Sequence, residues 1–352
     1  MTKKVLMCGN EACGEGAILA GCRFYAGYPI TPQNELIAYL AKRLYETGGV
    51  FIQAESELAA INMVFGAACV GARAMTSSSS PGISLKQEGI SYLVGCELPC
   101  VIVNIQRGGP GLGNIAPSQA DYFQAVKGGG HGDYKLIVLA PSSAQELLDH
   151  TYLAFELADK YRNPVFILGD GLLGQMMEPV QIKTEDEMPK PPDKPWALTG
   201  CVGRKPRIIK SLLLGEGALE EHNKRLQEKF GGIKEAEVRS QAFHTKDSDI
   251  ILVAYGSVAR MAKAAMETAR AKGMKVGMIR PITLWPFPDK VIEEAAGRAR
   301  KFLVVEMSAG QMVEDVRLAV NGRTAVEFYG RMGGGIPAEE EILQRIEALV
   351  LT

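Results

Sequence analysis

The chain has 352 residues, of which 47% are hydrophobic and 22% charged, and its formal net charge is −1. This length allows two domains with separate cores, and the balanced charge gives no bias towards nucleic acid or membrane surfaces. The first apolar run stops at Gly9, too early for a signal peptide, and no run is long enough to span a bilayer. We therefore expect a cytoplasmic globular protein.

The cysteines point to reduced thiols. Their odd number and the lack of any Cys-x-x-Cys pair argue against a disulfide framework, an iron–sulfur cluster or a metal site in this chain. Most lie in apolar or small-residue segments, so we expect small buried side chains. The seven positions are Cys8, Cys13, Cys22, Cys69, Cys96, Cys100 and Cys201.

Short apolar runs alternate with helical segments in the first half of the chain. Runs without polar alternation are typical of strands buried on both faces, which predicts a parallel sheet covered by helices. A helix between residues 139 and 164 has Ser142 or Ser143 as its N-cap, with Glu146 completing a capping box. The expected strands are 49–53, 73–76, 101–105, 136–140 and 164–168.

The pattern changes in the second half. Residues 185–195 are too rich in proline for a helix or a central strand. We expect an α/β domain at 1–185, a linker at 186–245 with a local helix near 218–230 but no core, and a smaller α/β domain at 246–352. Its strands are expected at 249–256, 275–279, 302–306 and 325–329, and its helices at 258–271, 289–299, 311–320 and 338–349.

An acidic residue in an apolar row is the most informative feature. On a helix over residues 57–68, Glu57 shares one row with Ile61, Val64 and Ala68. A carboxylate in such a row needs a partner, and desolvation favours its protonated form, which can donate a hydrogen bond. Glu55 is the competing acid, but it lies at a strand end and off this row.

Two turns could carry chemistry or could simply cap helices. Residues 28–32, Tyr-Pro-Ile-Thr-Pro, form a rigid turn in which Thr31 would be an N-cap and Pro32 would lie in the first helical turn. The serine run 77–80 closes a strand and opens another helix. Its hydroxyl groups could hold an anion at the helix N-terminus or only cap the helix.

Arg107 ends a strand and precedes a glycine-rich loop. Ligands of parallel α/β sheets bind beyond the carboxyl ends of strands, so Arg107 could hold a carboxylate through two parallel bonds, or it could be a surface arginine. His131, in a second glycine cluster, could be an acid or base, or merely exposed. The Gly-Asp-Gly at 169–171 lacks the downstream Asn of a metal–diphosphate motif, so we interpret it as a strand-to-loop turn.

Together these motifs resemble the α subunit of the 2-oxoacid:ferredoxin oxidoreductases over nearly the whole chain. The residues that carry the resemblance are the 28–32 turn, Ser56-Glu57 with Ala60, the serine run 77–82 and the Arg107–Pro110 loop. Residues 250–288 resemble the transketolase C-terminal type of domain. The serine run, residues 107–114 and residues 126–133 are most similar to the 2-oxoisovalerate (3-methyl-2-oxobutanoate) branch.

The resemblance implies an α/β pyrimidine-binding domain for thiamine diphosphate and a smaller transketolase-like domain. In the family a glutamate on a helix hydrogen-bonds the aminopyrimidine ring and promotes its imino tautomer, and Glu57 matches this position. Thr31 matches the threonine that contacts the substrate, and Arg107 matches the basic residue near its carboxylate. The expected cofactor contacts are Glu57, Tyr28, Pro29, Ile30 and Ser80.

The resemblance also implies partner subunits. A β subunit would hold the diphosphate and Mg²⁺ and carry a [4Fe-4S] cluster, alongside a γ subunit and a ferredoxin-like δ subunit. The complex would oxidise 2-oxoisovalerate to its acyl-CoA, with coenzyme A as co-substrate and ferredoxin as electron acceptor. No metal is assigned to this chain.

Other functions stay open. The apolar Leu112 and Ile115, in the loop after Arg107, favour a branched aliphatic 2-oxoacid, but an apolar pocket discriminates by only about 1–3 kcal/mol per methylene. The same chemistry on 2-oxoglutarate, pyruvate or indolepyruvate is therefore an alternative. A non-catalytic structural subunit is another. A plain nucleotide-binding module is disfavoured, because residues 9–14 do not fit Gly-x-Gly-x-x-Gly.

Overall fold

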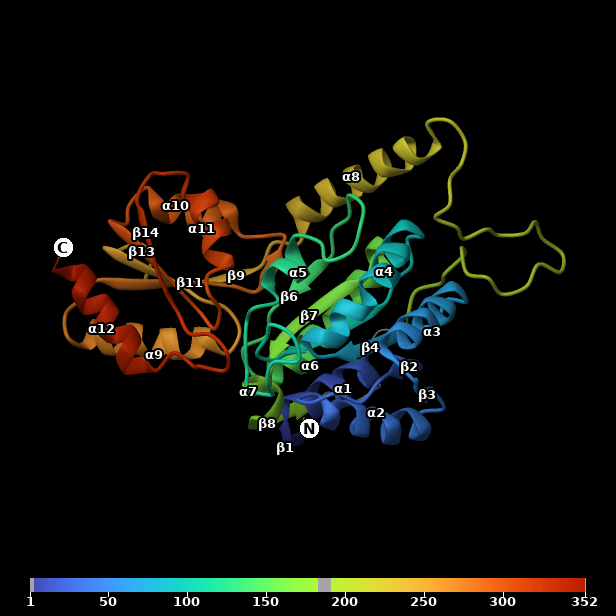
Figure 1. The fold of residues 1–352 in the computed structure, drawn as a ribbon, viewed down its shortest axis with the longest axis horizontal. Helices are drawn as coiled ribbons and strands as arrows, with labels where there is room; N and C mark the ends of the chain where they lie inside the picture. The colour runs from blue at the N-terminus through green and yellow to red at the C-terminus, as the bar shows by residue number, and fades with distance from the viewer. Residues whose placement is uncertain (1–2, 183–190, 352) are drawn as a thin grey trace.

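Two parallel sheets, each with helices packed on it, organise the protein (Figure 1). The structure is a computed structural model that describes residues 3–182 and 191–351. Residues 183–190, which include part of the predicted proline-rich segment, lie outside the described residues. No helix among the described residues is long and apolar enough to cross a membrane.

The larger sheet has seven strands in the order β12-β6-β7-β5-β4-β2-β3. Its strands run parallel except β12, which is antiparallel to β6. Every residue of β4, β5, β6 and β7 is buried, which confirms the predicted covered parallel sheet. The strands are β2 (Phe24–Gly27), β3 (Val50–Gln53), β4 (Ala74–Ser78), β5 (Val101–Gln106), β6 (Ile137–Leu139), β7 (Val165–Asp170) and β12 (Thr283–Trp285).

Helices follow most strands of this sheet and cover it. Helix α1 packs between α2 and α6, and α3 packs against α4 (Figure 1). A separate two-stranded sheet joins β1 (Lys3–Cys8) to β8 (Met177–Ile182). The helices are α1 (Gly9–Leu19), α2 (Asn34–Glu46), α3 (Glu57–Cys69), α4 (Ser80–Gly95), α5 (Tyr122–Val126), α6 (Ala144–Tyr161) and α7 (Gly171–Gln175).

The smaller sheet has the order β14-β13-β10-β11-β9, parallel except for β9. Its elements match the predicted strands and helices to within a few residues, except for β9, which was not predicted and lies in the expected linker. The division into domains stays a prediction, and β12 pairs with the larger sheet although it follows β11. The elements are β9 (Ser240–Phe243), β10 (Ile250–Val253), α9 (Val258–Ala271), β11 (Val276–Pro281), α10 (Asp289–Ala296), β13 (Lys301–Glu306), α11 (Met312–Val320), β14 (Ala325–Gly330) and α12 (Glu339–Val350).

Helix α8 (Ala218–Ala236) corrects the expectation of a linker without a core. Its residues Leu226, Phe230 and Ile233 are buried in the main hydrophobic cluster. The Phe230 ring also meets the Trp285 ring edge-on, with 6.0 Å between centroids. The sequence around α8 is polar enough to read as a linker, but one stripe of the helix covers the larger sheet and is apolar.

Two local predictions, a capping box and a turn, are also corrected. Ser143 is the N-cap of α6 and accepts from Glu146 N at 3.1 Å, but the Glu146 carboxylate accepts from Ser142 N instead of closing a capping box. The 169–171 segment is not a strand-to-loop turn. Asp170 caps α7 by accepting from Leu173 N at 3.0 Å, so a helix follows the strand directly.

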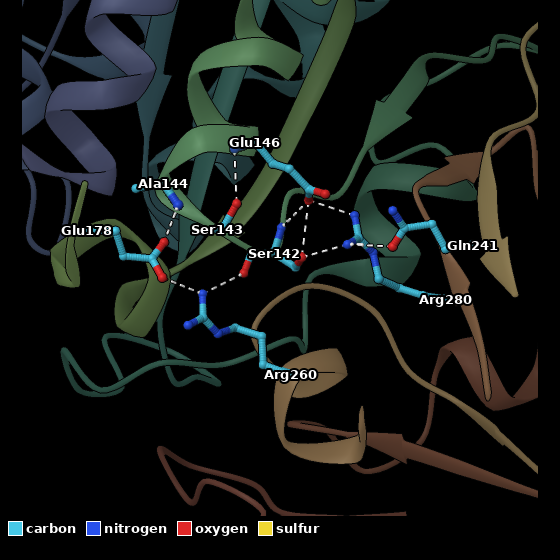
Figure 2. A network of polar contacts seen from close by, with 8 residues as sticks. All are labelled: Ser142, Ser143, Ala144, Glu146, Glu178, Gln241, Arg260 and Arg280. Atoms are coloured by element: carbon cyan, nitrogen blue, oxygen red, sulfur yellow. Dashed lines mark hydrogen bonds and ion pairs between the residues drawn. The ribbon is translucent and has the colours of Figure 1, made fainter. Parts of the chain in front are cut away.

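A network of charged contacts joins the two sheets (Figure 2). Arg280 of β11 donates to Ser142 Oγ at 2.7 Å and to Glu146 Oε2 at 2.6 Å. Arg260 of α9 donates to Glu178 Oε1 at 2.7 Å, and the other oxygen of Glu178 accepts from a backbone N–H at the start of α6. Charge-assisted bonds of this kind hold one fixed geometry, so they orient the smaller sheet relative to the larger one.

The cysteines are free thiols, as expected. All but Cys201 are buried or half-buried, and burial raises the pKa of Cys13, Cys22 and Cys100 to about 12. These thiols are therefore neutral packing groups at physiological pH.

Candidate functional site

The candidate residues follow four neighbouring strands of the larger sheet. Thr31 follows β2, Glu57 follows β3, Ser80 follows β4 and Arg107 follows β5. These strands are adjacent in the order β5-β4-β2-β3 and run parallel. All four residues therefore lie at the carboxyl edge of one sheet, the position at which α/β folds bind ligands.

Glu57 is the first residue of α3. The N-cap Ser56 accepts from Ala59 N at 3.1 Å and sets the start of the helix. The side chain of Glu57 is only 6% exposed, and the whole predicted row of Glu57, Ile61, Val64 and Ala68 is buried. No hydrogen bond or ion pair joins its carboxylate to another described residue, although buried polar groups are normally paired. Glu55 is exposed.

Gly82, in the first turn of α4, packs directly against this acid. A Cβ atom at Gly82 would lie 2.5 Å from Glu57 Oε1 and 2.0 Å from Ser78 Oγ. Only glycine allows the helix to approach so closely. Ser78 Oγ and Ser79 Oγ are buried and have no hydrogen-bond partner in the described part of the chain. One of these unpaired hydroxyl groups, Ser78 Oγ, therefore lies next to the unpaired acid.

Arg107 is not a surface arginine, since it is only 7% exposed. Its Nη1 donates to the carbonyl oxygen of Thr31 at 2.9 Å, and its Nη2 donates to the carbonyl oxygen of Leu112 at 3.1 Å. Its Nε is buried and has no partner among the described residues. The guanidinium is thus fixed by two backbone carbonyls, while not all of its donors are engaged by described residues.

The predicted role of Thr31 as a helix cap is wrong. The peptide bond between Thr31 and Pro32 is cis, and α2 begins only at Asn34, after Gln33. The Thr31 hydroxyl instead accepts from Asn34 Nδ2 at 3.2 Å. Its backbone carbonyl binds Arg107, so the structure brings these two candidates into direct contact. The preceding residues Tyr28 and Pro29 are exposed.

Ser80 supports the loop of Arg107 from within the protein. Its hydroxyl donates to Asp121 Oδ2 at 2.6 Å and accepts from Arg107 N at 3.0 Å. Its backbone N–H donates to Asn104 Oδ1 at 3.0 Å. Burial raises the pKa of Asp121, whereas hydrogen bonds from Ser80 and Asn104 lower it. The hydroxyl that was expected to contact a cofactor is therefore already engaged by Asp121.

Two buried groups at this edge were not identified from the sequence. Gln33 is fully buried and accepts from Ser77 Oγ at 2.6 Å, while its Nε2 has no described partner. Lys86 of α4 is also fully buried. A signal for Lys86 existed, because it lies three residues after Ile83 and four before Ile90, within an apolar row.

Comparison with known proteins identifies the family. Residues 15–223 match the family described as pyruvate flavodoxin/ferredoxin oxidoreductase, thiamine diphosphate-binding. Residues 248–342 match core domain II of pyruvate:ferredoxin oxidoreductase. The first match covers more than half of the chain and includes every candidate residue of the site.

Two relatives match along nearly their whole length. The chain is 53% identical to ketoisovalerate oxidoreductase subunit VorB of Methanothermobacter marburgensis, with 97% of this chain and 96% of that protein covered. It is 39% identical to 2-oxoglutarate synthase subunit KorA of the same organism, with 98% and 99% covered.

Solved structures agree with this assignment. The chain is similar to a 2-oxoglutarate:ferredoxin oxidoreductase from Magnetococcus marinus with 2-oxoglutarate, coenzyme A and succinyl-CoA bound, at TM-score 0.88 and 28% identity. The match covers 98% of this chain and 65% of that one. A split-gene transketolase, at TM-score 0.60 and 13% identity, shares the fold. The chain therefore belongs to the 2-oxoacid:ferredoxin oxidoreductase family, as a subunit of the alpha type.

Proposed function

We propose that this chain is the alpha-type subunit of a complex that oxidises 2-oxoisovalerate to the corresponding acyl-CoA and reduces ferredoxin. The observation that carries the proposal is the buried, unpaired Glu57, which faces Gly82 at the carboxyl edge of the sheet. The relative named ketoisovalerate oxidoreductase is 53% identical, against 39% for the relative named 2-oxoglutarate synthase, which favours the branched-chain substrate.

The site fits the aminopyrimidine part of thiamine diphosphate. Glu57 offers a carboxyl group with no hydrogen bond or ion pair to another described residue, and Gly82, which has no side chain, lets α4 pack directly against it. In our proposal Glu57 hydrogen-bonds the ring nitrogen that faces it, while Tyr28, Pro29 and Ile30 line the ring from the β2 turn. When bound, thiamine diphosphate supplies the carbanion chemistry that breaks the bond to the carboxyl group of the 2-oxoacid.

Arg107 and Thr31 are proposed to hold the substrate. The two carbonyl bonds orient the Arg107 guanidinium, and its remaining donors suit a carboxylate. Thr31 is half-buried beside it, so its hydroxyl can reach the same ligand. Leu112 is 82% exposed in the loop that Arg107 anchors, and Ile115 is exposed as well. We propose that these apolar side chains contact the branched aliphatic end of the substrate or the partner that covers it.

The site is proposed to be completed by partners. A β subunit would hold the diphosphate with Mg²⁺ and carry the [4Fe-4S] cluster, and γ and δ subunits would complete the complex that passes electrons to ferredoxin. The names of the relatives as subunits support an assembly of this kind. Coenzyme A would accept the acyl group. The predicted cytoplasmic location stays a prediction.

The test is to co-express the chain with the products of neighbouring genes and purify the complex without oxygen. Coenzyme A-dependent reduction of a viologen dye is then measured with 2-oxoisovalerate, 2-oxoglutarate, pyruvate and indolepyruvate. We expect the highest kcat/KM with 2-oxoisovalerate. A higher kcat/KM with 2-oxoglutarate would make 2-oxoglutarate the proposed substrate instead. No activity with any 2-oxoacid would overturn the enzymatic function.

Glu57 is tested in the same complex. Glu57→Gln keeps the size of the side chain but cannot exchange a proton, so we expect kcat to fall by about 100-fold or more. Glu55→Gln, an exposed change two residues earlier, is the matched control and is expected to leave kcat unchanged. Full activity of Glu57→Gln would favour a structural role for this chain.

A further inference from the structure

Lys86 is a buried lysine without an acidic partner in contact. It is 0% exposed and is among the largest fully buried side chains of the described residues. Its Nζ donates to Thr76 Oγ1 at 2.7 Å, and no ion pair joins it to another described residue. A lysine is almost never fully buried unless it is paired, so this position calls for a reason beyond packing.

The packing of α4 on α3 places Lys86 next to the site. Gly82, Lys86 and Gly89 are four and three residues apart, so they lie on one face of α4. A Cβ atom at Gly82 would meet Glu57, and one at Gly89 would lie 2.7 Å from Ile61 Cγ2. Glu57 and Ile61 are one turn apart on α3, so Lys86 lies between these two contacts, beside the buried row that begins with Glu57.

Three groups face the Lys86 side chain from the elements packed around it. Thr76 of β4 accepts its hydrogen bond, Glu57 of α3 acts on it through space, and Cys100 precedes β5. Burial lowers the pKa of Lys86 to about 7, while Glu57 and Cys100 oppose the shift. Cys100 is neutral at this pH, because burial raises its own pKa to about 12. Glu57 is thus the ionisable group with which Lys86 interacts near neutrality.

We propose that Lys86 is a positioning residue that acts through Glu57, with its positive charge opposing the proton that Glu57 must share with the cofactor ring. This inference rests on the proposed function. The hydrogen bond between Glu57 and the aminopyrimidine nitrogen contains one proton. When Lys86 takes up a proton from solvent, a second positive charge lies in the same poorly solvated region. This charge raises the free energy of the proton that Glu57 shares with the ring. When Lys86 is neutral, the shared proton is retained.

The test measures the affinity of the assembled complex for thiamine diphosphate with Mg²⁺, by calorimetry, across the pH range around the Lys86 pKa of about 7. Lys86→Met removes the charge and nearly keeps the length. We expect the affinity ratio of Lys86→Met to wild type to be near one on the alkaline side and to rise roughly tenfold on the acid side. A ratio that does not change with pH would overturn the proposal.

Three controls separate this effect from damage to the fold. Ile90→Met alters the same face of α4 without a change of charge, and its ratio to wild type is expected to be flat. An analogue with C–H in place of the ring nitrogen that faces Glu57 is expected to abolish the pH-dependent difference between Lys86→Met and wild type. Thr76→Val keeps the lysine but removes its hydrogen-bond partner, which disfavours the charged form of Lys86. We therefore expect the affinity for thiamine diphosphate to change at a lower pH in this variant than in wild type.

The outcomes also distinguish this inference from the proposed function. If Lys86→Met does not fold, an unmoved transition in Thr76→Val overturns the role of Lys86. A pH-dependent ratio that persists with the C–H analogue also overturns it, since no shared proton is then involved. If the wild-type complex binds no thiamine diphosphate at any pH, the proposed function fails and this inference fails with it.

Discussion

The carboxylate of Glu57 lies against the backbone of Gly82, so closely that a Cβ atom there would be 2.5 Å from Oε1. The acid at the start of α3 is thus in direct contact with the first turn of α4, and no side chain separates them. This contact leaves no room for a side chain at position 82, so the position of the acid depends on the glycine.

Gly82→Ala tests the contact between Gly82 and Glu57. The added methyl group overlaps Glu57 and Ser78, so one or both must move. We expect kcat/KM of the complex to fall by about 100-fold, because a displacement of about 1 Å at a reacting group can have this effect. Overpacking should also destabilise the chain by about 1–3 kcal/mol.

Gly66→Ala is the matched control for that change. Gly66 lies on α3, and a Cβ atom there would meet nothing within 4 Å. The alanine should stabilise the helix by about 0.5–1 kcal/mol and leave the kinetics unchanged. Wild-type kinetics in Gly82→Ala would show that the reaction does not depend on the present position of the Glu57 carboxylate.

Arg107→Lys tests the anchored guanidinium. Lysine has a single ammonium group and cannot reproduce the two bonds to the carbonyl oxygens of Thr31 and Leu112 while it also holds a carboxylate. We expect KM for the 2-oxoacid to rise by about tenfold or more, and by more than kcat falls. Arg107→Ala should have the same pattern with a larger rise. Arg298→Lys, an exposed change after α10, is the control, and an unchanged KM in Arg107→Lys would remove the residue from the substrate site.

Lys86→Met should stabilise the chain at neutral pH. The pKa of Lys86 is about 7 in the folded chain and near 10.5 when unfolded, so between these values the unfolded state binds more protons. The wild-type chain therefore loses stability as the pH falls from about 10.5 to about 7. The variant lacks this loss and should be more stable at pH 7 by up to about 5 kcal/mol, less the hydrogen bond to Thr76.

Thermal unfolding of both chains across this pH range measures the difference. We expect the gap between Lys86→Met and wild type to narrow as the pH rises towards the value for an exposed lysine. A gap of constant size would mean that Lys86 is charged in the folded protein at every pH in this range.

His150 should make the contact between the two sheets sensitive to acid. It lies one turn after Glu146 on α6, close enough to interact electrostatically with Glu146 and Arg280, and its Nδ1 is buried without a described partner. Burial lowers the pKa of His150 to about 4, while the Glu146 carboxylate opposes the shift. The unfolded state thus binds more protons between about pH 6.5 and pH 4, and stability should fall by at most about 3 kcal/mol across that window.

His150→Leu removes the titrating group from this network. The variant should lose less stability than wild type between neutral and acid pH, as measured by thermal unfolding. The exposed His131 provides the control in His131→Leu, which should follow the wild-type curve. If His150→Leu also follows that curve, the acid sensitivity has another source.

Local features of the chain were predictable because they depend on residues close in sequence. The row that starts at Glu57 follows from helical spacing alone, and its burial is confirmed. The continuous apolar runs predict the parallel sheet, because strands covered on both faces have no need of polar alternation. A parallel sheet then places the residues that follow its strands at one edge, so the meeting of Thr31 and Arg107 was within reach of the sequence.

Other features needed the three-dimensional contacts. The sequence predicts Thr31 as the N-cap of α2, but the structure has Gln33 in that position. The carbonyl oxygen of Thr31 accepts a hydrogen bond from Arg107, and the helix begins later. Helix α8 joined the core through contacts with residues distant in the chain; its apolar stripe can be seen in the sequence, but the surface that this stripe packs against cannot.

The sequence by itself determined the sheet, the helix of Glu57 and the family motifs, since spacing along the chain decides which residues share a face. Only the tertiary structure decided that Gly82 packs directly against Glu57 and that Lys86 lies one turn further along the same face of α4. Those relationships depend on how α4 crosses α3, and a crossing is set by the fit of two surfaces, which no single helix contains. Glu57 could be identified from the sequence, but its contacts with α4 depend on the tertiary structure.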